Sequence, residues 1–120
     1  MEIFGREYGF LHSVGAEQEI ARLCPEGDLR NLRALLGGSG DEAIESAKEL
    51  LCILSRWFEK AKAFSEPGYE PKPLTKELLD LLTPLQFLAL QAEAMRRFRE
   101  DEKQTVEAEA AKKNGERKSS

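Results

Sequence analysis

The sequence predicts a mainly α-helical fold with a short N-terminal β-hairpin, an α+β arrangement that carries a charged C-terminal extension. Three observations predict it. Apolar residues recur at helical spacing in several segments up to Phe98, Gly5 suits a tight hairpin turn, and residues 99–120 are rich in charge and lose the apolar pattern. We therefore expect one compact domain over residues 1–98 and a tail over residues 99–120 that ranges from helical to disordered.

Residues 1–14 are expected to form the hairpin. Gly5 and Arg6 would be the central residues of its turn, since glycine suits the first central position, and Phe4 would then pair with Glu7. One hairpin is marginally stable, so helices must cover its apolar face. In this register Met1 lies opposite Phe10 and Ile3 lies opposite Tyr8, with all four side chains on that face.

Two short helices should follow the hairpin. The first is expected at about 16–24, where it ends before the turn-forming segment Pro25–Gly27. The second is expected at about 28–36, because Asp28 can cap its start and leucines recur at helical spacing up to the Gly37–Gly38 pair.

The third helix, at about 41–65, has the strongest pattern. Ser39 and Glu42 have the spacing of a capping box, and the Pro67–Gly68 pair follows the last turn. Apolar residues in steps of three and four make one wide face that is typical of a buried helix. We expect three of its side chains in the core: Leu51, Leu54 and Phe58.

An extended connector and two more helices should complete the domain. Three prolines and a glycine in residues 66–73 exclude regular helix there. A short helix is expected at about 75–82. The last helix, at about 84–98, should begin with Thr83 as its cap and Gln86 as the reciprocal partner, with proline between them at the first helical position.

Composition limits the classes of function. The formal net charge of −4 disfavours a surface built to neutralise phosphates. Cys24 and Cys52 are too few for a disulfide framework, so we expect free, largely buried thiols. The longest apolar run is the segment Leu50–Leu54, and no secretory signal pattern begins the chain. We expect a soluble, cytoplasmic protein.

No residue pattern predicts catalysis, a cofactor or a metal. The GGSGDE segment at residues 37–42 lacks the lysine and the preceding strand of a phosphate loop, so a helix-capping linker is favoured. Ser39 lacks the final glycine of a nucleophile elbow. His12 has no cluster of ligand residues near it in sequence and is expected as an ordinary edge-strand residue. The protein is therefore expected not to be an enzyme.

Arg96, Arg97 and Arg99 surround Phe98, as in some nucleic-acid-binding strips. Glu93 and Glu100 lie four residues from Arg97 and Arg96, however, and pairing within the helix is the favoured interpretation.

Three large aromatic residues are candidates for contact with a partner. Core packing competes with this interpretation, because aromatic residues at helical spacing usually face inward. The candidates are Trp57, Phe64 and Tyr69.

Taken in order, several blocks of the chain resemble tail assembly chaperones of long-tailed phages and prophages of Gram-positive bacteria. The resemblance spans most of the chain, and its motifs are hairpin, helix and linker patterns with no catalytic signature. The blocks are GREYGFLHSVGAEQEIARLCPEGDL, KELLCILSRWFEKAKAF, EPGYEPKPLT and AEAAKKN.

The resemblance implies a non-enzymatic protein that binds the helical tape-measure protein before the tail tube assembles, helps recruit tube subunits, and is absent from the finished virion. Such families commonly make a longer product by ribosomal frameshifting, and Lys112-Lys113-Asn114 is compatible with a slippery codon run. A homo-oligomer is left open. The alternative is a small regulatory protein, either a helical nucleic-acid binder or an antitoxin-like inhibitor, for which salt-dependent DNA binding would be diagnostic.

Overall fold

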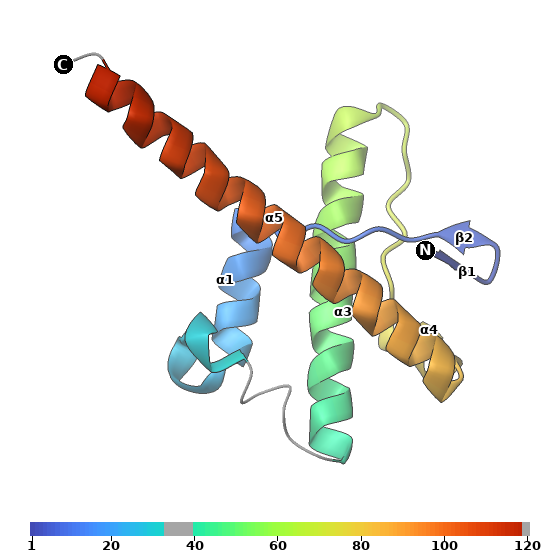
Figure 1. Ribbon diagram of the computed structural model, residues 1–120. Helices are drawn as coiled ribbons and strands as arrows, with labels where there is room; N and C mark the ends of the chain where they lie inside the picture. The colour runs from blue at the N-terminus through green and yellow to red at the C-terminus, as the bar shows by residue number, and fades with distance from the viewer. Residues whose placement is uncertain (33–39, 119–120) are drawn as a thin grey trace.

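The computed structural model describes residues 1–32 and 40–118, and side chains in the last helix through Asp101. The fold is mainly helical with a two-stranded N-terminal hairpin, as the sequence predicts (Figure 1). The described elements, in chain order, are β1 (Glu2–Ile3), β2 (Arg6–Glu7), α1 (Val14–Leu23), the 3₁₀ turns η1 (Pro25–Gly27) and η2 (Leu29–Asn31), α3 (Asp41–Ser65), α4 (Lys76–Asp80) and α5 (Pro84–Lys118).

The helix α3 is the centre of the fold. It packs against α1, α4 and α5, and α5 crosses it and continues beyond the body of the molecule (Figure 1). The central residues of α3 are among the most buried. They form one core with side chains from the N-terminal segment, α1, the connector, α4 and α5. The core consists of Ile3, Tyr8, Phe10, Ala16, Ile20, Cys24, Leu50, Leu51, Ile53, Leu54, Leu74, Leu79, Leu90, Ala94 and Phe98.

The N-terminal segment after the hairpin is packed between α3 and α5. The backbone N–H of Leu11 donates to the carbonyl oxygen of Leu54 in α3 (3.1 Å), and the next backbone N–H, of His12, donates to Oδ2 of Asp101 in α5 (3.0 Å). Phe10 is buried between these bonds and the hairpin. The N-terminal segment thus links the two long helices, and its contacts with α5 extend past the boundary expected at residue 98.

The predicted hairpin register is wrong by two residues. The structure pairs Glu2 with Glu7 and Ile3 with Arg6, so the turn residues are Phe4 and Gly5. Both have positive φ, 48° and 79°, as a primed two-residue turn requires, whereas the predicted turn assumed glycine at its first position. A slip of two residues keeps every side chain on its original face. The predicted buried face is therefore correct although the pairs are not: Ile3, Tyr8 and Phe10 are buried and Met1 is half-buried.

Helix boundaries follow the capping chemistry. Helix α1 begins two residues before the predicted start, because the side chain of Ser13 accepts a hydrogen bond from the N–H of Ala16 (3.2 Å). Asp28 is a cap, as predicted, but the turn after it is 3₁₀ rather than α-helical. Residues 33–36 of that predicted helix lie outside the described residues.

The bounds of α3 match the prediction, but its predicted cap does not. The N-cap is Gly40, with φ of 82° and no side-chain hydrogen bond, while Ser39 lies outside the described residues. The predicted capping box at the start of α5 is confirmed. Thr83 N–H donates to the side-chain oxygen of Gln86 (2.9 Å), and Gln86 N–H donates to Oγ1 of Thr83 (3.2 Å). Helix α5 runs to Lys118, and α4 is shorter than predicted.

The connector between α3 and α4 is held along α3 by two polar side chains one helical turn apart. Ser55 is fully buried, and its hydroxyl accepts the N–H of Leu74 (2.9 Å). Glu59 accepts the N–H of Lys72 (3.2 Å). Because the connector lacks regular structure of its own, these bonds satisfy backbone groups that a buried loop would otherwise leave unpaired.

Candidate partner-binding surface

An apolar groove of about 480 Å³ lies where the N-terminal half of α3 meets α4 and the start of α5. Three polar side chains reach its edge, and the remaining lining is apolar. The lining residues are Ala43, Ile44, Ala47, Lys48, Leu79, Asp80, Leu82, Pro84, Phe87, Leu88 and Gln91. Wide apolar grooves between helices are sites where proteins take up apolar ligands or a partner helix.

Ion pairs fix the α3–α4 wall of this groove. Lys48 of α3 pairs with Asp80 of α4, and with Glu45 one turn back along its own helix at 3.1 Å. Hydrogen bonds to Asp80 and then to Glu45 raise the pKa of Lys48 above its usual value. Lys76 of α4 pairs with Glu49 of α3. Ion pairs that remain partly open to solvent contribute little stability each, and the effect of these two is to link α4 to α3.

Large apolar side chains are exposed beside the groove. Ile44 in the groove is 46% exposed, and Leu81, Leu85 and Leu88 around the α4–α5 junction are 60–79% exposed. Monomeric proteins expose single apolar side chains routinely, but several in one short segment, as at residues 81–88, favour an interaction surface.

Two of the three predicted contact residues, Trp57 and Phe64, lie in the C-terminal half of α3, and Tyr69 lies in the connector that follows it. Phe64 is 94% exposed and is not part of the core cluster that the described residues form. Trp57 is half-buried: its ring lies so close to Gly15 of α1 that an added Cβ there would come within 2.3 Å of it, and Lys60 Nζ lies 4.3 Å from its centroid. At 1.5 Å rise per residue, Phe64 is about 30 Å from the groove residue Ile44. The structure therefore does not bring these three residues together with the groove.

Tyr69 belongs to a polar cluster built on Glu59. The Glu59 side chain is 4% exposed, and it accepts hydrogen bonds from Tyr69 Oη (2.6 Å) and from an Arg6 guanidinium nitrogen (2.7 Å). That Arg6 nitrogen also donates to Tyr69 Oη (3.1 Å). The cluster joins the hairpin and the connector to α3, so the hydroxyl of Tyr69 is used within the chain.

Burial of Glu59 would raise its pKa. Hydrogen bonds from Tyr69, Arg6 and the backbone of Lys72 outweigh that effect and hold the pKa below its usual value. Glu59 is therefore a buried, charged carboxylate that accepts three hydrogen bonds and holds the hairpin and the connector against α3.

His12 is not in a strand, which corrects the expected edge-strand position. Its ring is stacked on Phe98 of α5, with centroids 4.0 Å apart, and Nε2 lies 3.9 Å from Glu17 with no hydrogen-bond partner among the described residues. Within the described part of the chain, no three His, Cys, Asp or Glu side chains are grouped so that they could hold a metal ion.

The two cysteines are free, as predicted, with Cys24 buried and Cys52 half-buried. Burial raises the pKa of both thiols, which is typical of unreactive cysteines.

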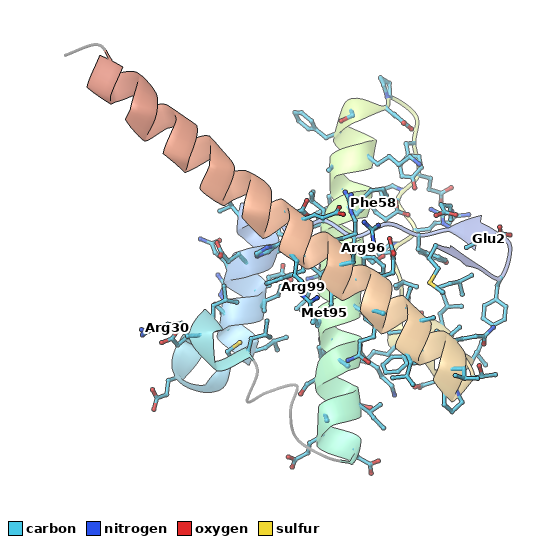
Figure 2. All side chains as sticks on the ribbon, viewed as in Figure 1. Glu2, Arg30, Phe58, Met95, Arg96 and Arg99 are labelled. Atoms are coloured by element: carbon cyan, nitrogen blue, oxygen red, sulfur yellow. The ribbon has the colours of Figure 1, made fainter. Side chains whose placement is uncertain are left out.

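Charge pairing within α5 is confirmed, but Glu93 pairs with Arg96 and not, as expected, with Arg97. Arg96 bonds to Glu93 and to Glu100, each at 2.6 Å, and Arg97 pairs with Glu100 at 3.2 Å. Arg96 lies near the crossing of α5 with α3, close to Phe58 (Figure 2). These ion pairs partly neutralise Arg96 and Arg97, two of the three arginines that surround Phe98.

The groove residues were missed as a binding site by sequence reasoning. The apolar residues of the last helix, with Phe87 and Leu88 of the groove among them, cover a wider face than packing on one neighbouring helix needs. That width was the available signal.

Comparison with protein-family models, with curated proteins and with solved structures found no match for this chain. A search of the described residues for a helix of sufficient length and apolar character to cross a membrane also found none.

Proposed function

We propose that this protein is a tail assembly chaperone of a long-tailed phage or prophage, and that it holds a helical segment of the tape-measure protein in the groove between α3, α4 and α5. The observation that carries the binding mode is the open apolar groove with Ile44 and Leu88 on its walls. The sequence resemblance supplies the identity of the partner.

The groove is suited to an amphipathic helix. Such a helix inserts apolar side chains spaced at i, i+3 or i+4 and i+7, while its polar face stays in water. Asp41 and Glu42 are exposed beside the first groove residue on α3, so a client helix with lysine or arginine at that end would be favoured electrostatically.

Under this proposal the protein shields apolar surface on the tape-measure protein in the host cytoplasm, helps recruit tail-tube subunits and leaves before the virion is complete. The binding requires no catalytic group and no cofactor. A longer product made by frameshifting near Lys112-Lys113 would carry the same groove joined to an additional segment.

The test is co-expression with a tape-measure protein encoded beside this gene. The wild-type chain is expected to raise the soluble yield of the tape-measure protein, and Ile44→Glu is expected to abolish that gain, because a carboxylate in the groove would be desolvated by an apolar helix. Ile44 is 46% exposed, so the variant should fold. Circular dichroism spectra that match the wild type would establish this.

Phe64→Glu is the matched control, because Phe64 is exposed on the same helix and lies far from the groove. Retained solubilisation with Phe64→Glu supports binding in the groove. Loss with Phe64→Glu but not with Ile44→Glu would instead assign the contact to the aromatic candidates Trp57, Phe64 and Tyr69. No gain in solubility with the wild-type chain, together with salt-dependent binding to duplex DNA, would reject the chaperone in favour of the regulatory alternative.

A further inference from the structure

The N-terminal part of α5 is apolar on two opposite sides. One side packs into the core through Leu90, Ala94 and Phe98, which are at most 8% exposed. On the opposite side four apolar residues at helical spacing face solvent, and we call them the outer strip: Leu85, Leu88, Ala89 and Ala92. A helix that is apolar around its circumference is normally buried on all sides. We therefore expect the exposed outer strip to pack against a partner.

The outer strip is distinct from the groove. The groove meets α5 on the side that carries Phe87 and Gln91, and of the outer strip only Leu88 also lines it. Leu85 is 79% exposed and Leu81, just before the helix, is 70% exposed, so the apolar surface continues around the start of α5 away from the groove.

The composition of the strip suits a second copy of the same surface. No residue from 81 to 92 is charged, in a chain in which 33% of residues are charged. Two copies that meet through this surface bury no charged side chain from residues 81–92, and so avoid the cost of desolvating one. Ala89 and Ala92 are small, which allows two helices to approach closely along the strip.

The charges at the two ends of the strip favour one orientation. Along the chain, Arg99 comes after the strip and lines a shallow depression with Leu88 and Ala92, while Glu77 in α4 comes before the strip. Both side chains are exposed, and neither forms an ion pair among the described residues. Figure 2 shows Arg99 on the part of α5 that lies beyond Met95. In an antiparallel pair, each Arg99 would approach the acidic end of the other copy, whereas a parallel pair would place like charges together.

We propose that two copies of this chain associate through the outer strip, with their α5 helices antiparallel about a two-fold axis. Such an isologous contact buries the same residues on both copies and closes on itself. Of the groove lining it covers Leu88 alone, so the rest of each groove could still hold a segment of one long helical client, which adds avidity. The dimer itself does not depend on the proposed function.

The first experiment is analytical ultracentrifugation of the full chain over a range of concentrations. The wild type is expected to be a dimer at micromolar concentration, and Leu85→Glu is expected to weaken association at least about tenfold while its circular dichroism spectrum stays that of the folded chain. Phe64→Glu removes an apolar side chain outside the strip that is more exposed than Leu85, and it should leave the dimer intact. A wild-type chain that is monomeric at about 100 µM, or a dimer that Leu85→Glu does not weaken, would overturn the proposal.

The second experiment tests the orientation. Arg99→Glu and Glu77→Arg should each weaken the dimer, and the double variant should restore it, because the reversed pair is again of opposite sign. A double variant weaker than either single variant would reject the antiparallel arrangement. Ile44→Glu should remain dimeric while it loses the client, so that failure of the dimer and failure of the proposed function are distinguished.

Discussion

Leu54→Ala is expected to lower the free energy of unfolding by about 2–5 kcal/mol, the range for truncating a fully buried leucine. Leu54 is 0% exposed at the middle of α3, within the core cluster that includes Phe10, Ile20 and Leu90. Its neighbours come from the N-terminal segment, α1 and α5, so they cannot all move in to fill the cavity. Urea denaturation followed by circular dichroism would measure the change.

Phe64→Ala is the control for this experiment. The side chain removed is larger, but it is 94% exposed, and the free energy of unfolding should change by no more than about 0.5 kcal/mol. Equal destabilisation by the two variants would mean that the core is not centred on Leu54.

Glu59→Ala is expected to cost about 3 kcal/mol at neutral pH. The change removes an acceptor of three hydrogen bonds, from Arg6, Tyr69 and the backbone of Lys72, at about 1 kcal/mol each. It also releases the contacts that tie the hairpin and the connector to α3. The comparison is with Glu70→Ala, an exposed carboxylate in the same connector, which should change stability by less than about 0.5 kcal/mol.

The same carboxylate should make stability fall in acid. The pKa of Glu59 is lower in the folded chain than its usual value, so the folded state binds this proton less readily than the unfolded state does. The stabilisation is therefore complete above the usual glutamate pKa and is lost as pH falls through the lower, folded value. Glu59→Gln should lose less stability than the wild type between about pH 5 and pH 3. Parallel pH profiles for the two proteins would contradict this assignment.

Much of the secondary structure could be predicted from the sequence, because caps and periodicity are local. The Thr83–Gln86 capping box uses groups three residues apart, and its two hydrogen bonds are present as expected. The bounds of α3 followed from its apolar period and the Pro67–Gly68 pair after it. Leu51 and Leu54 were correctly predicted as core, while Phe58 is only half-buried, against Gly9.

The hairpin register could not be settled in the same way. Both candidate turns include Gly5 and place the same side chains on the buried face, so the pattern of apolar residues does not distinguish them. The observed register requires Phe4 to adopt a φ of 48°, which is uncommon for a residue with a side chain. In the folded chain the N-terminal ammonium donates to the carbonyl oxygen of Tyr8 at 2.9 Å, a contact that belongs to the observed register.

The sequence by itself determined the helical class, the position of α3 and the absence of charge from residues 81 to 92, since each depends only on residues near one another in the chain. Only the tertiary structure decided which apolar residues stay exposed. Phe64 and Leu54 both belong to the wide apolar face of α3, yet one faces solvent and the other is fully buried. Exposure depends on which helices cross α3 and where, and the groove exists only because α4 and α5 meet it near Ile44 and leave a gap between them.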